Sequence, residues 1–160
     1  MKKILVCGGR DWSRDRYQFL HHVLNKKIPK GSLLIVGEAI GVDTQAAIWA
    51  NRGGIDVSLF IANWAEFGKR AGPLRNKDML DKGKPDMVIA FPGGKGTKNM
   101  IMQATRACVP VLRVTEEDYL EYRKTHPFIV PLSGSDELSY RSRVEAALRA
   151  KKQSQEDIKF

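Results

Sequence analysis

The sequence predicts an α/β fold with a parallel sheet, because short apolar runs of strand length alternate with segments of helical length. The strand-like runs are continuously apolar, which is typical of parallel strands that helices cover on both faces. Right-handed crossovers between such strands produce a doubly wound sheet. We therefore expect a Rossmann-like sheet of about five strands, followed by a C-terminal helical extension.

The predicted elements follow one another in regular order. Strands are expected at 4–6, 33–36, 57–61, 86–91 and 110–114, where the apolar runs lie. Helices are expected between them at 13–26, 44–52, about 75–82 and 98–107. The helix at 44–52 has a face of alanines, and we expect Asp43 to cap its amino end.

The length of the chain, 160 residues, fits one domain with a substantial core. We assign residues 1–115 to this domain and residues 116–160 to an extension packed on it. Within the extension, 126–131 is a candidate edge segment, and 133–136 is a predicted turn that caps a polar helix ending near residue 153.

Composition indicates a globular protein, with 42% apolar and 28% charged residues. No apolar run approaches the roughly 18 residues that span a bilayer. The apolar stretch at 4–7 is also shorter than the core of a secretion signal. These observations predict a cytoplasmic protein with no membrane partner.

The formal net charge of +9 suits a polyanionic partner, either nucleic acid or a small phosphorylated ligand. The basic residues are spread along the whole chain, so a general role in solubility is the simpler interpretation. Cys7 and Cys108 are expected to be buried and unpaired. Neither the cysteines nor the three histidines have metal-ligand spacing, so the sequence predicts no metal site.

Glycines collect directly after three of the predicted strands, in the turns Gly8-Gly9, Gly37 to Gly41, and Pro92-Gly93-Gly94-Lys95-Gly96. Because the carboxyl ends of parallel strands meet at one edge, these turns are expected where α/β folds bind ligands. Glycine permits a close approach, and the helix after each turn offers N–H groups to an anion. The pattern predicts a site for a phosphate-bearing ligand.

The last of these turns reads PGGKGT, and its Thr97 can cap the next helix or bond a phosphate oxygen. The GxxxxGK[ST] spacing of a P-loop is absent, which argues against ATP hydrolysis of that kind.

The segment 63–76 carries aromatic, basic and amide side chains close to the same edge. Arg75 suits bidentate binding of a phosphate or carboxylate, and the alternative is an ion pair with Asp78. Trp12 or Trp64 can stack on a base, and the alternative for each is a partly buried surface anchor.

Four motifs together resemble the SLOG superfamily, and within it the YspA-like (cpYpsA-related, DUF2493-type) branch. They read GGRDW at 8–12, GxAxGVD at 37–43, NW…GKxAGPxRN at 63–76 and FPGGKGT at 91–97. The resemblance extends from about Lys2 to Val114 and implies a Rossmann-like domain that binds nucleotides or nucleotide-derived signals such as ADP-ribose-type molecules. It also suggests a homodimer or higher homo-oligomer.

On this basis the predicted ligand is a small, phosphorylated, nucleotide-like molecule, with no other cofactor predicted. The residues expected to hold phosphate are Gly8, Gly9, Gly93, Gly94, Gly96 and Thr97, with Arg10 and Arg75 as charge clamps. The remaining predicted ligand-binding residues are Trp12, Gly37, Gly41, Asp43, Trp64, Asn76 and Pro92.

Related phosphoribohydrolases in the superfamily cleave a nucleotide N-glycosidic bond and use a PGGxGTxxE motif with a catalytic glutamate. Here that position is Met100, which cannot move a proton or stabilise a cationic transition state. Glu38 and Asp11 are candidate replacements. A second alternative is single-stranded nucleic-acid binding, because the resemblance extends to a DNA-processing branch with a similar arginine–asparagine turn.

Overall fold

The computed structural model describes residues 1–127, 146 and 149, and the chain divides after Pro127 into two units. The first unit is Met1–Pro127. Most of the predicted edge segment at 126–131, and the turn at 133–136, lie outside the described residues. So does the predicted polar helix, except that residues 146 and 149 are helical. The division at residue 115 therefore stays a prediction.

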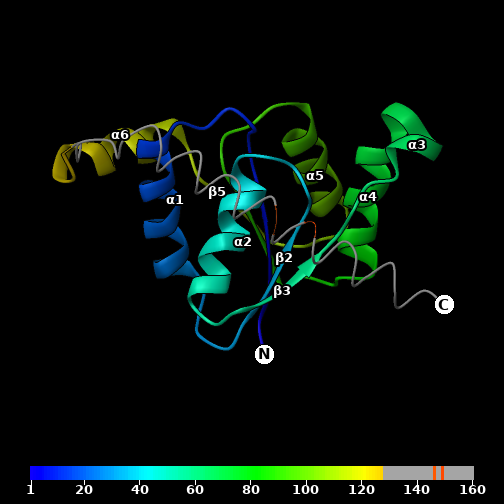
Figure 1. The fold of residues 1–160 in the computed structure, drawn as a ribbon, viewed down its shortest axis with the longest axis horizontal. Coiled ribbons are helices and arrows are strands. Elements are labelled where there is room, and N and C mark those ends of the chain that lie inside the picture. Colours follow the sequence, from blue (N-terminus) through cyan, green and yellow to red (C-terminus); the bar gives the residue numbers. More distant parts are fainter. Residues whose placement is uncertain (128–145, 147–148, 150–160) are drawn as a thin grey trace. The chain divides into compact units, whose positions relative to one another are not determined.

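Five parallel strands form the central sheet of this unit, in the order β3-β2-β1-β4-β5 (Figure 1). They are β1 (Lys3–Cys7), β2 (Leu33–Val36), β3 (Asp56–Leu59), β4 (Met87–Ala90) and β5 (Val111–Arg113). Leu5 of the central strand pairs with Ile35 on one side and Val88 on the other. The predicted Rossmann-like fold is confirmed, and the strand order reverses between β1 and β4, where such folds bind ligands.

Helices cover both faces of the sheet (Figure 1). On one face α1 (Arg14–Lys27) packs against α2 (Val42–Arg52), and α6 (Glu116–Thr125) packs on α1. On the other face α4 (Ala71–Asp81) packs against α5 (Lys95–Arg106). A short helix α3 (Trp64–Phe67) and a 3₁₀ turn η1 (Gly68–Arg70) precede α4.

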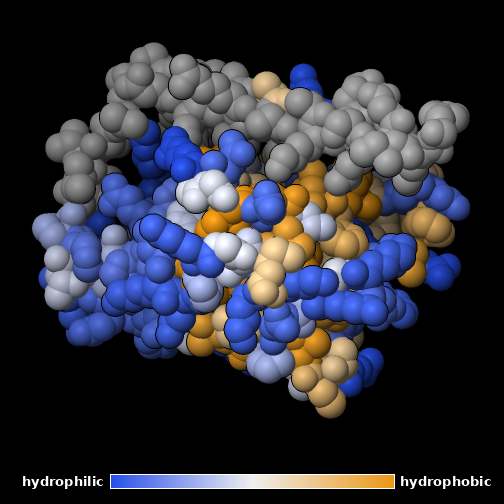
Figure 2. Space-filling model, turned by 90° about the horizontal axis from the view of Figure 1, so that it is seen from below, coloured by the Kyte–Doolittle hydropathy of each residue, from blue (hydrophilic) through white to orange (hydrophobic). Residues whose placement is uncertain are grey.

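The core between the sheet and these helices is apolar. Leu5, Ile35 and Val88 from three neighbouring strands contact Met79 of α4 and Met100 of α5, and all five side chains are buried. Seen from below, hydrophilic residues dominate on the side of α1 and α6, whereas hydrophobic residues gather towards the middle and the side of α4 (Figure 2).

Three helices begin earlier than the sequence predicted. Helix α2 begins at Val42 with Gly41 as its N-cap, so the prediction that Asp43 caps it is wrong. Helix α5 begins at Lys95 with Gly94 as its N-cap, which places Thr97 inside the first turn rather than at the cap. Helix α4 begins at Ala71 because a proline is tolerated in a first turn, where its missing N–H has no helical acceptor.

The cysteines differ from expectation in one respect. Cys7 and Cys108 are both free, but only Cys7 is buried. Cys108 is exposed in the turn after α5, where its φ of 56° reverses the chain. Within the part of the chain that the structure describes, no helix is both long enough and apolar enough to span a membrane.

Candidate functional site

Hydrogen bonds join the glycine-rich turns at the carboxyl edge of the sheet. The N–H of Gly9, after β1, donates to the carbonyl of Pro92, after β4, at 2.9 Å. The carbonyl of Gly9 accepts from the N–H of Val42 at 3.1 Å, which connects the same turn to the start of α2. The three turns that the sequence placed at one edge therefore form a continuous surface.

Close packing between these turns explains several of the glycines. Gly41 has a φ of +90°, and a Cβ there would come within 2.8 Å of the Cα of Arg10. Gly8, Gly9 and Gly93 likewise lie so close to neighbouring turns that a side chain would collide. Their first role is to let the turns approach one another.

The beginning of α5 is different, because it opens outward. Added Cβ atoms at Gly94 and Gly96 would meet nothing within 4 Å. No side chain caps the helix, and the N–H of Lys98 is the first to bond back, to the carbonyl of Gly94. The preceding N–H groups and the helix dipole suit an anion.

Arg75 reaches the same edge from α4. Its guanidinium lies over Gly37 at the end of β2, where an added Cβ would be 2.5 Å from Nη1. That Nη1 atom is buried and has no hydrogen-bond partner among the residues that the structure describes. The alternative pairing with Asp78 is not adopted, since Asp78 pairs with Lys82 at 3.2 Å. A buried donor without a partner is uncommon in folded proteins and calls for an explanation.

Asn76 positions both Arg75 and the start of α5. Its Oδ1 accepts from Arg75 Nε at 3.3 Å, and its Nδ2 donates to the carbonyl of Gly96 at 3.2 Å. Nδ2 also donates to Oδ1 of Asn99, which the sequence analysis did not identify. Asn99 accepts in turn from Gln103 four residues later, so an i,i+4 amide pair is the signal that was missed.

Asp43 of α2 approaches the same point of Gly37 as Arg75. Its Oδ2 would be 2.7 Å from a Cβ at Gly37 and accepts the N–H of Ala39 at 3.3 Å. Burial raises the pKa of Asp43 to about 6, and the positive charge of Arg75 offsets part of that shift. The site therefore combines a buried carboxyl that titrates near neutrality with a guanidinium that is incompletely paired.

Glu38 connects this edge to the segment after β3. Its Oε1 accepts from the N–H of Ala62 at 3.0 Å and from Nε1 of Trp64 at 3.3 Å. Asp11 and Arg10 lie in the turn after β1 and are exposed. The two residues predicted as candidate catalytic groups thus occupy different surroundings on the same edge.

Trp12 is held as a structural anchor. Its Nε1 donates to the carbonyl of Pro92 at 3.2 Å, and its ring meets Phe91 edge to face at 5.5 Å. Met100, in the second turn of α5, is buried in the core. A carboxylate at that position would have to enter an apolar environment.

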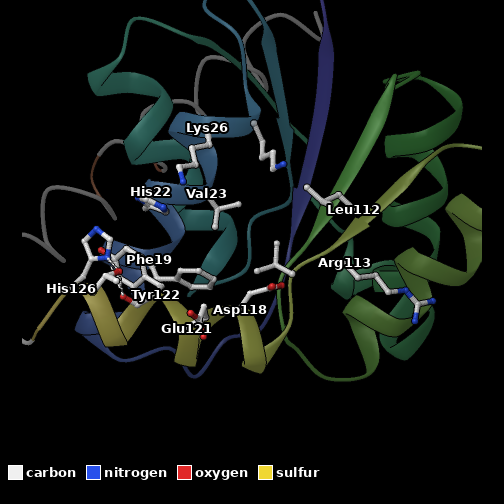
Figure 3. A pocket seen from close by; sticks show the side chains of 13 residues that line it. Phe19, His22, Val23, Lys26, Leu112, Arg113, Asp118, Glu121, Tyr122 and His126 are labelled. Carbon is white, nitrogen blue, oxygen red and sulfur yellow. Dashed lines mark hydrogen bonds between the residues drawn. The ribbon is translucent and has the colours of Figure 1, made fainter.

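A separate groove of about 470 Å³ lies between α1, β5 and α6 (Figure 3). Phe19, Val23 and Leu112 form apolar parts of its lining, with Lys26 and Asp118 among its charged residues. Burial, followed by the nearby charges of Lys26 and His126, lowers the pKa of His22 in the same lining. The groove contains none of the predicted site residues, because all four sequence motifs lie outside α1, β5 and α6.

No group of three or more histidine, cysteine or acidic residues among the described residues is arranged to hold a metal ion.

Comparison with known proteins decides the family. The sequence profile of the YspA, cpYpsA-related SLOG family matches residues 2–67. The Gene 61 protein of Mycobacterium phage D29 is 35% identical over 122 residues, which cover 70% of this chain and 95% of that protein. The chain belongs to the YspA, cpYpsA-related SLOG family. The profile match includes the turns after β1 and β2 and ends before Arg75 and the PGGKGT turn.

The fold of this SLOG chain also resembles a solved structure. The X-ray structure of DNA processing protein A (DprA) from Streptococcus pneumoniae superposes with a TM-score of 0.61 at 18% identity. The match covers 86% of this chain and 61% of the DprA chain. At this identity the likeness concerns the fold.

Proposed function

We propose that the protein binds a nucleotide or nucleotide-derived ligand, of nucleoside-phosphate or ADP-ribose type, as a sensor or sequestering module. The ligand's phosphate lies at the open first turn of α5, and Arg75 binds the same group. The observation that carries the proposal is the buried Nη1 of Arg75, which lacks a partner among the described residues. Asn76 connects this arginine to Gly96 in the first turn of α5, a helix that begins without a side-chain cap.

The surrounding contacts support a preorganised site. Asn76 holds Arg75 through Nε and the helix start through the carbonyl of Gly96, so the guanidinium and the helix N–H groups keep a fixed relative position. A planar guanidinium held in this way can form two parallel bonds to a phosphate at little entropic cost. Membership of the SLOG family and the net charge of +9 agree with an anionic nucleotide ligand.

Hydrolysis of a nucleotide N-glycosidic bond is the alternative. It requires Glu38 or Asp11 to act in place of the catalytic glutamate, because Met100 occupies that glutamate's position in this chain. Glu38 directly follows Gly37, against which the Arg75 guanidinium lies. The protein is incubated with nucleoside monophosphates. Release of free base by the wild type, and its loss in Glu38→Gln, supports the enzyme. Tight binding without release supports the binding module.

Single-stranded nucleic-acid binding is the second alternative, favoured by the exposed Lys95, Lys98, Lys69 and Arg70 in the segments that contribute to this edge. It predicts affinity that falls steeply with salt, in proportion to the phosphates contacted. A small-ligand site responds to salt much less.

The proposal is tested by calorimetric titration of AMP and ADP-ribose into the wild type and Arg75→Ala. Charge-assisted hydrogen bonds are worth about 1.5–3 kcal/mol, so the variant is expected to bind roughly 10- to 100-fold more weakly. Arg106→Ala is the matched control. Arg106 is exposed at the carboxyl end of α5, far from the first turn, so its loss leaves affinity unchanged. Equal affinity in the wild type and Arg75→Ala, or equal loss in both variants, contradicts the proposal.

A further inference from the structure

The three tryptophans of the chain differ in what remains available to a ligand. Trp12 uses its indole N–H on Pro92 and its ring on Phe91. Trp49 donates its N–H to Asn25 at 2.8 Å, between α2 and α1. Trp64 is 47% exposed, although it too has its N–H bonded. It is therefore the tryptophan with the most open ring surface.

Two independent contacts place the Trp64 ring near residues that adjoin Arg75, the arginine of the proposed phosphate site. Its Nε1 bonds to Glu38, which directly follows the Gly37 that lies against the Arg75 guanidinium. Its ring end lies 3.3 Å from where a Cβ of Gly72 would be, one helical turn before Arg75. Both neighbours of Trp64 are thus close to Arg75. Glu38 follows Gly37, which the guanidinium contacts, and Gly72 precedes Arg75 by three residues in α4.

Glu38 fixes the orientation of this ring. The same Oε1 accepts the N–H of Ala62 and the indole N–H, so one carboxylate holds both the end of the β3 segment and the side chain that follows it. Asn63 caps the short helix by accepting the N–H of Glu66 at 3.1 Å. A half-exposed indole held by its N–H edge offers a flat apolar surface at low entropic cost.

We infer that the aromatic base of the ligand stacks on Trp64, with Glu38 as the positioning residue that holds the indole. The inference rests on the proposed function and narrows it. The preferred ligand carries a base. A sugar phosphate or inorganic phosphate can bind Arg75 but has no base to stack on Trp64. Base–aromatic stacking tolerates any base because every base has a π-face, so it predicts a general nucleotide preference rather than selection of one base.

The experiment compares AMP, GMP and CMP with ribose 5-phosphate, which retains the phosphate and the sugar but has no base. Stacking is expected to give the wild type roughly tenfold higher affinity for the nucleotides. Trp64→Ala should reduce nucleotide affinity to the level of ribose 5-phosphate and leave ribose 5-phosphate itself unchanged. Trp64→Phe should retain part of the preference. Trp49→Phe, on the other face of the sheet, is the matched control and should behave as the wild type.

A pair of variants at Glu38 separates positioning from a general structural role. Glu38→Ala removes the acceptor and should weaken nucleotide binding while sparing ribose 5-phosphate, whereas Glu38→Gln keeps the oxygen that accepts both N–H groups and should retain most of the nucleotide preference. A variant that merely loosens the fold would weaken both ligands.

The outcomes separate this inference from the proposed function. If the wild type binds ribose 5-phosphate and nucleotides equally, in an Arg75-dependent manner, the stacking inference is overturned and the phosphate site stands. If Trp64→Ala weakens all ligands to the same degree, stacking is likewise overturned. If the wild type binds none of the four ligands, both proposals fail.

Discussion

Two arginines, Arg75 and Arg16, illustrate two ways in which this protein uses a guanidinium. Arg16 of α1 makes a bidentate pair with Glu116 of α6, at 2.8 and 2.9 Å, and its charge lies 4.4 Å from the ring centre of Tyr119. Arg75 has a single side-chain bond, to Asn76, and a buried Nη1 without a partner among the described residues.

The surroundings of the two arginines differ in the same way. At the contact of α1 and α6, the hydroxyl of Tyr119 bonds to Asp15, and Thr115 forms a capping box with Asp118. At the glycine-rich edge, Asp43 is buried with a raised pKa and α5 begins without a side-chain cap. The scaffold contact satisfies its polar groups, whereas the proposed binding site keeps polar groups that a ligand can satisfy, at a cost in stability.

The first way to sharpen this comparison is Asp43→Asn, which should stabilise the protein at neutral pH. The native pKa of about 6 exceeds the ordinary value of 3.8, so the native state binds the proton more tightly than the unfolded chain. The ionised, buried Asp43 therefore lowers the free energy of unfolding. This loss is absent below pH 4, grows between pH 4 and 6, and is complete above pH 6. Roughly two pKa units correspond to about 3 kcal/mol, and the asparagine can still accept from Ala39.

Urea unfolding of wild type and Asp43→Asn at pH 4 and pH 7 measures this difference. The gap in unfolding free energy should widen at pH 7, with the variant more stable. Because only the difference between the two proteins is compared, titration of other groups cancels. A gap that is the same at both pH values would show that Asp43 is ordinarily ionised in the fold.

The second and smaller effect is expected for Arg16→Ala, which should destabilise the fold without affecting ligand affinity. The ion pair with Glu116 is partly exposed, so the pair and the ring contact together are worth about 1 kcal/mol. Thermal unfolding should occur about 3 °C lower. A double-mutant cycle with Glu116→Ala checks the cause, since additive losses in the two single variants would exclude coupling between them.

Much of the fold could be predicted from the sequence, because continuous apolar runs and their spacing report burial directly. All five strands lie where those runs are, and the parallel sheet follows from the helices between them. The apolar pattern could not predict that α2, α4 and α5 begin as early as they do. Glycine and proline usually end helices, and here Gly94, Gly96 and Pro73 lie at or within a first turn.

The site was predictable as a set of turns but less so as a set of contacts. The glycines showed which loops share an edge, and the structure places the guanidinium of Arg75 against Gly37 at that edge. The role of Arg75 in ligand binding stays a prediction. The use of Glu38 as an acceptor for Trp64 depends on tertiary placement over 26 residues, which no local pattern encodes. Ligand identity, catalysis by Glu38 or Asp11, cytoplasmic location and the predicted homo-oligomer all stay predictions.

Backbone amide NMR of the full chain during titration with AMP tests the central claim most directly, because it reports each turn separately. The account predicts that the largest shifts fall on the N–H groups of Lys95, Gly96 and Thr97 and in the turn around Gly9. The amides of α1 and α6 near Arg16 should remain unchanged. Shifts concentrated around the α1–α6 contact, or saturable binding that leaves the first turn of α5 unperturbed, would contradict the assignment of the glycine-rich edge as the ligand site.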